Sequence, residues 1–303
     1  MIRNLVSKLK FLVVYTLVLL VMSGCTSNPP FSVDDLQSKL EHAISGFQGD
    51  VGLYVRHLNQ DLELGIHEND TFPTASMIKV PIMIRIFDRI EQGELALDSV
   101  VFYYKDSIHY QWKGDDAISR FKDGEDITIS KLLTHMLTFS DNHASLWLQA
   151  LGGSGSAIND WLEGAGFKVT RVNSRTEGRN SDYKRFGWGQ TSPKEMADLL
   201  IRIRQGSILT SGSSEKMYRH LTRTYWDGEA LSQIPPTVQV ASKQGAVDES
   251  RSEVVLVNAP HGDYAFCIIT NHQQDTSWDD SNEGFILIRN ISRILWNYFE
   301  GIQ

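Results

Sequence analysis

The stretch TVQVASKQGAVDESRSEVVLVNAPHGDYAFCIITN, residues 237–271, contains three runs rich in Val, Ile, Tyr and Phe, residues that favour β-strands. These runs are residues 237–243, 253–259 and 264–271. Near the other end of the chain, residues 51–58 and 62–67 alternate apolar and polar side chains and predict a β-hairpin. Strands at both ends of the chain, with helical patterns between them, predict an α/β (α+β) fold built on a split antiparallel sheet.

Helical patterns flank the strands and fill the middle of the chain. Residues 32–48 and 283–299 each predict an amphipathic helix, and residues 76–93 predict a largely apolar one. Residues 170–191 show no clear periodicity, which predicts a long functional loop. We therefore expect a sheet domain with an all-helical domain inserted into it. The sheet domain is expected to comprise residues 31–75 and 226–303, and the helical domain residues 76–225.

The first 24 residues have the composition of a secretory signal. A basic start is followed by the apolar run 11–22 and by Ser23-Gly24-Cys25. Small residues immediately before a cysteine are similar to a bacterial lipoprotein signal, with cleavage before Cys25 and lipid on its thiol. Residues 25–30 would then form a short tether. We expect an exported protein that is lipid-anchored at a membrane, in the periplasm or at the cell surface. The plainer alternative is an ordinary signal peptide followed by a chance cysteine.

The remaining composition excludes several classes of function. After the signal, the chain has 26 basic and 37 acidic residues. An acidic exported chain is a poor candidate for nucleic-acid binding. Cys267 lies in an apolar run and is expected to be buried, so no disulfide is expected once Cys25 carries lipid. Cys and His residues lack the spacing of a zinc site, so we expect no metal and no cofactor. A monomer is the expected state.

Three short motifs carry nucleophilic chemistry. In Ser76-Met77-Ile78-Lys79, a serine expected at the start of a helix has a lysine one turn away, and a desolvated lysine can take the proton of a serine. Ser140-Asp141-Asn142 follows an apolar helix, and Lys243-x-Gly245 ends a strand. Each motif also has a simpler interpretation, respectively as a helix cap with a surface lysine, a helix-ending turn and a strand end.

Together and in this order, the motifs resemble the signature of the class A β-lactamases and their penicillin-binding relatives. The resemblance covers nearly the whole chain after the signal. It implies that Ser76 attacks a carbonyl and becomes acylated, that Lys79 assists removal of its proton, and that Ser140 passes a proton to the leaving nitrogen. Asn142 would bind the substrate amide.

The resemblance also assigns the strand residues. Lys243 would attract the substrate carboxylate, and the backbone N–H of Ala246, with that of Ser76, would form the oxyanion hole. Gly245 would let the substrate lie against the strand edge, and Arg251 is expected to help hold the carboxylate. Tyr103, Tyr110 and Trp112 lie where the family places an aromatic on the pocket wall, although each has a simpler interpretation as a core or surface residue.

The sequence departs from the family at two positions. Gln244 stands where the family has Thr or Ser, and a Gln side chain can donate an N–H to the carboxylate but is longer. Glu177 is the candidate for the base that hydrolyses the acyl-enzyme, but the residues after it do not follow the family pattern. Its alternative is a surface glutamate in a loop rebuilt for another purpose.

The leading interpretation is therefore an exported serine hydrolase of the class A β-lactamase type, opening β-lactam amides through an acyl-Ser76 intermediate. Two alternatives stay open. One is a D-alanyl-D-alanine carboxypeptidase, transpeptidase or esterase acting on cell-wall peptides. The other is a sensor that binds penicillin or cell-wall peptide without turnover. The expected partner is accordingly a small β-lactam or a cell-wall peptide.

Overall fold

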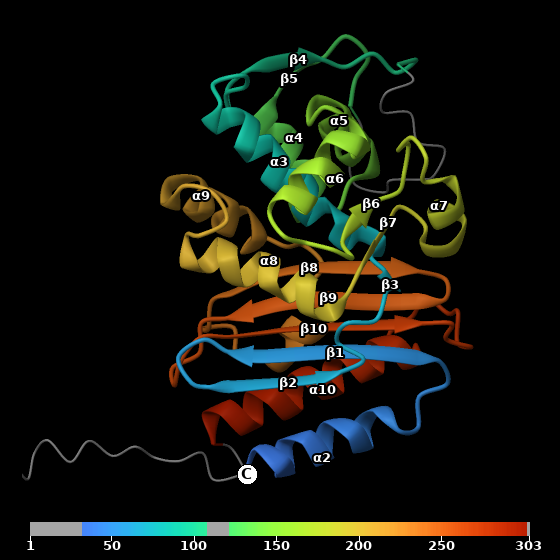
Figure 1. Ribbon diagram of the computed structural model, residues 1–303, viewed down its shortest axis with the longest axis vertical. Helices are drawn as coiled ribbons and strands as arrows, with labels where there is room; N and C mark the ends of the chain where they lie inside the picture. The colour runs from blue at the N-terminus through green and yellow to red at the C-terminus, as the bar shows by residue number, and fades with distance from the viewer. Residues whose placement is uncertain (1–31, 108–120, 302–303) are drawn as a thin grey trace, which may run out of the picture.

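The computed structural model describes residues 32–107 and 121–301, and its centre is an antiparallel sheet of order β2-β1-β10-β9-β8 (Figure 1). The strands are β1 (Asp50–His57), β2 (Leu62–Ile66), β8 (Val240–Val247), β9 (Ser250–Val257) and β10 (Tyr264–Asn271). The N-terminal hairpin joins the three C-terminal strands through antiparallel pairing of β1 with β10. The predicted split antiparallel sheet is thus confirmed, and it leaves β8 as an edge strand.

Both faces of the sheet are covered. Along β9 every residue is buried, and alternate side chains enter two separate hydrophobic clusters. Val254 and Leu256 belong to the cluster shared with the helical layer, while Val255 and Val257 belong to the cluster shared with the terminal helices. This is why residues 253–259 form a nearly continuous apolar run rather than an alternating one.

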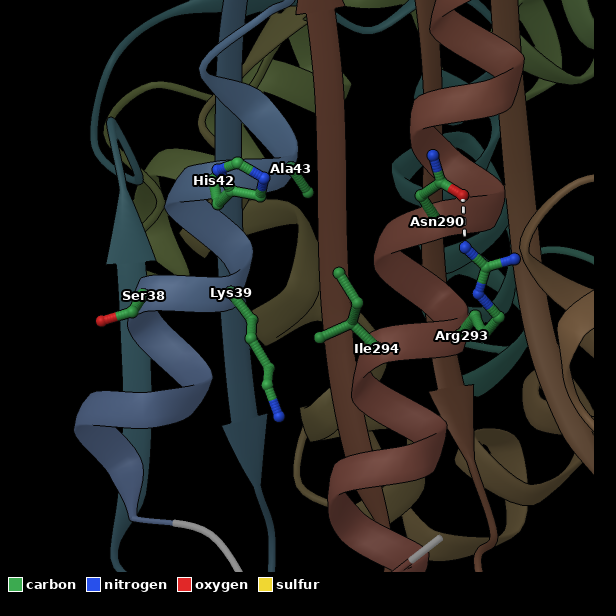
Figure 2. Close-up of a pocket in the computed structure, with 7 residues that line it drawn as sticks. All are labelled: Ser38, Lys39, His42, Ala43, Asn290, Arg293 and Ile294. Atoms are coloured by element: carbon green, nitrogen blue, oxygen red, sulfur yellow. Dashed lines mark hydrogen bonds between the residues drawn. The ribbon is translucent and has the colours of Figure 1, made fainter. Parts of the chain in front are cut away.

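The two terminal helices, α2 (Val33–Ile44) and α10 (Glu283–Glu300), lie side by side on one face of the sheet (Figures 1 and 2). Each has a side-chain N-cap: Ser32 accepts a hydrogen bond from the backbone of Asp35, and Asn282 accepts from Gly284 and Phe285. Within the described ranges 32–107 and 121–301, no helix combines the length and hydrophobicity needed to cross a membrane. The predicted signal and tether, residues 1–30, lie outside the described residues.

The other face of the sheet carries the helical layer (Figure 1). Its members are the 3₁₀ turn η1 (Ala75–Ile78), α3 (Lys79–Glu91), α4 (Ile129–Thr138), α5 (Asn142–Leu151), α6 (Ser154–Gly164), α8 (Pro193–Gln205) and α9 (Ser211–Leu221). Helix α8 packs directly against the strands. A further 3₁₀ turn, η2 (Ala230–Gln233), leads back to the sheet and packs against α10.

Some local structure differs from the sequence prediction. The segment 170–191 contains the short strands β6 (Arg171–Val172) and β7 (Gly189–Thr191) and the helix α7 (Asn180–Phe186). Strands β6 and β7 form a small sheet with β3 (Phe72–Pro73), and β4 (Val100–Phe102) pairs with β5 (Asp126–Thr128). The loop prediction for 170–191 was therefore only partly right, because elements this short carry too few residues to show a period.

Candidate functional site

One cavity brings the three sequence motifs together. It measures about 830 Å³ and lies between the edge strand β8, the turn η1 and the junction of α4 with α5. The predicted site residues that line it are Ser76, Ser140, Asn142, Gln244, Gly245 and Ala246. By contrast, a groove between α2 and α10, lined by Lys39, His42 and Arg293 among others, contains none of the predicted residues (Figure 2).

Ser76 lies in a strained 3₁₀ turn. The residue before it, Ala75, has a φ of 42°, in the left-handed region that costs a non-glycine residue about 1–3 kcal/mol. The turn is held by a hydrogen bond from the Met77 amide to the Thr74 carbonyl, 3.0 Å, and by the fully buried side chains of Met77 and Ile78. The expected helix thus begins at Lys79 rather than at Ser76, and the buried turn fixes the direction of the serine.

Lys79 connects two motifs. Its Nζ lies 2.9 Å from Ser76 Oγ, 3.0 Å from Ser140 Oγ, 2.6 Å from the Ser140 carbonyl and 2.9 Å from Asn142 Oδ1. The side chain is fully buried. An ammonium group has only three N–H donors for these four oxygens, whereas a neutral amine can accept a proton from one of the two serine hydroxyls. The geometry therefore allows Lys79 to take the Ser76 proton.

Ser140 and Asn142 are positioned by the start of α5. Asp141 caps this helix by accepting from the Ala144 amide at 2.5 Å, and its own amide donates to the His135 carbonyl at 3.1 Å. Ser140, at a φ of 60°, is held in the left-handed region by these neighbours. The hydroxyl of Ser140 and the amide oxygen of Asn142 are therefore both presented to Lys79.

Lys243 approaches Ser140 from the sheet. Its Nζ lies 3.1 Å from Ser140 Oγ, 2.9 Å from the Gln244 carbonyl and 2.8 Å from Gln244 Oε1. Burial, reinforced by the charge of Lys79, holds the pKa of Lys243 well below its usual value. The atom of Gln244 that faces Lys243 is the amide oxygen, which accepts a hydrogen bond from Nζ. The Gln244 amide nitrogen then remains for a ligand, and Gln244 lines the cavity.

Gly245 is the point where the strand meets the nucleophile. A Cβ at this position would lie 2.6 Å from the Thr74 carbonyl, closer than real Cβ atoms come, and in tight contact, at 3.0 Å, with the Ser76 amide nitrogen. Only glycine lets the β8 edge come this near to the Ser76 turn. The adjacent Ala246 also lines the cavity, so its backbone and that of Ser76 are the candidate oxyanion-hole donors.

A buried carboxylic acid lies behind this strand. Glu253 pairs with Gln244 in the β8–β9 register, and its side chain is 1% exposed. One oxygen accepts a hydrogen bond from the Ala230 amide at 3.0 Å. Burial raises the pKa of Glu253 to about 7. At low pH the group is therefore an uncharged acid next to the strand that carries Lys243.

Arg251 does not reach the cavity, which corrects the expectation that it holds a substrate carboxylate. Its side chain is fully buried on the α10 side of the sheet, with the guanidinium 4.5 Å from the Trp278 ring centre and 4.7 Å from that of Phe285. Its N–H groups donate to backbone carbonyls, including those of Val247 and Ser277. These contacts commit both terminal nitrogens of the guanidinium to the protein's own backbone.

Glu177 is also not brought to the site. Its side chain is exposed and does not line the cavity. The neighbouring residue Thr176 turns inward instead, donating to the Ser174 carbonyl at 3.0 Å, and Gly178 then takes a left-handed φ of 74°. Within the described residues, no side-chain hydrogen bond or ion pair joins Glu177 to the catalytic groups. The expectation of Glu177 as the hydrolytic base is therefore not supported.

The loop around Glu177 is instead held by its own polar contacts. Gln149 and Ser174 exchange two hydrogen bonds, of 2.6 and 3.0 Å. Arg179 donates to Asn173 Oδ1 at 2.7 Å and to Gln190 Oε1 at 2.8 Å. These contacts order the loop, but they leave the Glu177 carboxylate in solvent.

The aromatic residues of the site differ from the sequence expectation. Tyr103 is buried against Phe121 and Trp147, so it belongs to the core, and Tyr110 and Trp112 lie outside the described residues. The cavity is instead lined by residues that sequence reasoning missed, namely Phe139, Tyr225, Trp226, Asp227, Glu229, Trp278, Asp280, Phe285 and Ile288. They come from irregular segments, the C-cap of α4 and the first half of α10, where no local pattern marks them. Among the described residues, no group of three His, Cys, Asp or Glu side chains could hold a metal ion.

Comparison with known proteins agrees with this geometry. The model of the family described as "Beta-lactamase enzyme family" matches residues 35–299 of this chain. The chain is 23% identical over 278 residues to the β-lactamase VEB-1 of Pseudomonas aeruginosa, covering 88% of this chain and 91% of that one. It is 24% identical over 304 residues to the β-lactamase BRO-1 of Moraxella catarrhalis, covering 92% and 93%.

Solved structures show the same fold. A PBP-A variant, solved as its acyl-enzyme complex with penicillin G, has a TM-score of 0.76 at 24% identity, covering 90% of this chain and 99% of that one. A β-lactamase from Sphaerobacter thermophilus also has a TM-score of 0.76, at 19% identity, covering 89% and 97%. At these identities the likeness establishes the fold alone, so the chemistry has to be argued from the residues of the site.

Proposed function

Because the chain belongs to the β-lactamase enzyme family, we propose that it is a serine hydrolase that opens β-lactam amides through an acyl-Ser76 intermediate. One observation carries this proposal. Lys79 Nζ lies within hydrogen-bond distance of both the nucleophile Ser76 Oγ, at 2.9 Å, and the proton donor Ser140 Oγ, at 3.0 Å. A nucleophile, its base and a proton route to the leaving group are thus adjacent before any substrate binds.

The acylation step can be written with all atoms accounted for. Ser76 Oγ bonds to the β-lactam carbonyl carbon while its proton passes to Lys79 Nζ. The backbone amides of Ser76 and Ala246 stabilise the oxyanion that forms. When the carbon–nitrogen bond breaks, the ring nitrogen takes a proton from Ser140 Oγ, and Lys79 returns its proton to Ser140. The product is an ester on Ser76 with an opened ring.

Hydrolysis then requires a water to attack this ester, with a base to take the water's proton. The exposed Glu177 does not line the cavity, so its position does not support a role in activating this water. This observation favours a second candidate function, in which the enzyme acts on D-alanyl-D-alanine cell-wall peptides and releases penicillins slowly. Both functions share the acylation step.

We also propose that the protein is exported and held at a membrane by lipid on Cys25. The support is the sequence of residues 1–25 alone. Metabolic labelling with a palmitate analogue should mark the wild-type protein and not Cys25→Ser. Equal labelling of both would contradict this part of the proposal.

The function is tested with benzylpenicillin, a chromogenic cephalosporin and a D-alanyl-D-alanine peptide. Rapid cephalosporin turnover that disappears in Ser76→Ala supports the first function. A long-lived penicilloyl ester on Ser76, together with cleavage of the peptide, supports the second. An ester without peptide cleavage would point to a penicillin-binding sensor, and the absence of any reaction at Ser76 would overturn all three.

A further inference from the structure

The catalytic cavity continues past Ser76 into an outer part walled by aromatic side chains. Five aromatic residues line it, from the C-cap of α4, from α10 and from two irregular segments. They are Phe139, Tyr225, Trp226, Trp278 and Phe285. Tyr225, Trp226 and Trp278 are 55%, 44% and 59% exposed, so this part of the cavity presents aromatic surface to solvent. Exposed aromatic surface gathered in one cavity is typical of a binding site.

Trp226 is held on the leaving-group side of the cavity. Its indole N–H donates to the Phe139 carbonyl at 3.0 Å, and its ring lies edge-on to Tyr225 with centres 5.0 Å apart. The Tyr225 amide is itself bonded to the Thr138 carbonyl at 3.0 Å. Since Phe139 directly precedes Ser140, which protonates the leaving nitrogen, Trp226 stands beside the departing part of a substrate.

Trp278 is equally well fixed on another wall. Its indole N–H donates to Asp248 Oδ1 at 3.1 Å, and the buried Arg251 guanidinium lies over its ring. Asn282 donates to the Ser277 carbonyl at 2.9 Å and thereby anchors the segment that carries Trp278. An exposed indole with this many contacts is a preformed surface rather than a loose side chain.

The charged residues that line the cavity have one sign, although the buried Arg251 lies behind Trp278. Four acidic residues line the cavity, while Lys and Arg are missing from its described lining. Asp141 caps α5, and Glu229 is paired with Arg289 at 2.6 Å. Asp227, next to Trp226, and Asp280, close to Trp278, are exposed and form no ion pair within the described residues. Each wall thus combines an indole with an unpaired carboxylate.

Resting on the proposed function, we propose that this outer part of the cavity selects substrates that carry a cation on the leaving-group side. An ammonium or pyridinium group in this outer part gains cation–π attraction from the exposed Trp226 ring and Coulomb attraction from Asp227 and Asp280. The substrate class is therefore β-lactams, or amides acylating Ser76 in the same way, whose departing half is positively charged.

Three cephalosporins with the same thienylacetyl side chain test this selection. At C3 they carry a pyridinium-methyl, a phenylmethyl or an acetoxymethyl group, so the first two differ in charge at nearly equal shape. The measurement is kcat/KM from loss of β-lactam absorbance. We expect the pyridinium compound to exceed the phenylmethyl compound by about fivefold, and this ratio to fall with added salt.

Variants assign the effect to the named residues. The double variant Asp227→Asn/Asp280→Asn should lower the pyridinium-to-phenylmethyl ratio about threefold, and Trp226→Leu should lower it as well. The control Asp34→Asn/Asp61→Asn removes two exposed acids far from the cavity and should keep the wild-type ratio.

Two results would overturn the inference and leave the proposed function intact. One is hydrolysis of all three cephalosporins with equal specificity constants for the charged and uncharged compounds. The other is a ratio in Asp227→Asn/Asp280→Asn equal to that of the control variant. If none of the cephalosporins acylates Ser76, the proposed function itself fails, and the cation selection falls with it.

Discussion

Two regions that the chemistry would use together are built in opposite ways. The acylation groups are mutually bonded around two buried lysines: Lys79 and Lys243 both lie within 3.1 Å of the Ser140 hydroxyl, although they come from a helix and an edge strand. The turn around Glu177 is equally ordered, but its hydrogen bonds run inward through Asn173 and Ser174 and leave the carboxylate outside.

The difference indicates that the fold is preorganised for acylation rather than for hydrolysis of the ester. Attack on a carbonyl needs a nucleophile, a base and donors within a few tenths of an ångström, and the first region has this preorganisation. Hydrolysis of the ester needs a base near the ester, and the second region does not deliver one. Accordingly, formation of the acyl-enzyme is expected to be the well-supported half of the reaction.

The largest effect is expected from removing the nucleophile. Ser76→Ala should lower cephalosporin turnover on the order of 10⁴-fold or more, because it removes the η1 hydroxyl that is hydrogen-bonded to Lys79. The exposed Ser207→Ala variant serves as the control and should match the wild type. Residual turnover above one hundredth of wild type in Ser76→Ala would contradict the assignment of Ser76 as the nucleophile.

Moving the nucleophile without removing it should have a smaller effect. In Gly245→Ala the new methyl group would collide with the Thr74 carbonyl and press on the Ser76 amide. We expect the acylation rate constant, measured by stopped flow, to fall on the order of 10²-fold. Gly164→Ala, where a Cβ meets nothing within 4 Å, is the matched control. Equal rates in both variants would show that the approach of β8 is not critical.

The buried Glu253 should make the free energy of unfolding depend on pH. Its folded pKa of about 7 lies above the usual 4.5, so the folded state binds the extra proton. The stabilising contribution is present below pH 4.5 and is lost as the pH rises through 7, on the order of 3 kcal/mol. Glu253→Gln should remove this loss from the free energy of unfolding measured by urea titration between pH 4.5 and 7.5. The exposed Glu249→Gln variant should retain the wild-type pH profile.

The smallest effect is expected from Glu177. Glu177→Gln should leave the lifetime of the acyl-enzyme within about twofold of wild type, because the carboxylate does not line the cavity. A true hydrolytic base would be worth on the order of 10²-fold or more. Intact-protein mass spectrometry after a pulse of benzylpenicillin measures the lifetime. Strong accumulation of the ester in this variant would show that Glu177 does act in hydrolysis.

Much of this arrangement could be predicted from residue type and order. The split sheet followed from apolar runs at both chain ends, and Ser76, Lys79, Ser140 and Asn142 were found because their chemistry requires those residue types in motifs. What the sequence could not supply was their separation in space, since η1, α3, α5 and β8 meet only through packing of the two layers.

The failures have a different physical origin. Arg251 was misassigned because side chains alternate along a strand, and its register opposite Ala246 places it on the α10 face. Glu177 was misassigned because one turn residue decides which neighbour points inward, and here Thr176 does. Trp226 and Trp278 carried no local signal at all, since their role depends on long-range contacts with Phe139 and Arg251.

The most direct test of the central claim is the time course of intact mass after mixing the protein with benzylpenicillin, followed by peptide mapping of the adduct. The account predicts rapid appearance of one penicilloyl group, mapped to Ser76 and absent from Ser76→Ala, with decay that is the same in Glu177→Gln. An adduct on another residue, or no adduct at all, would contradict it.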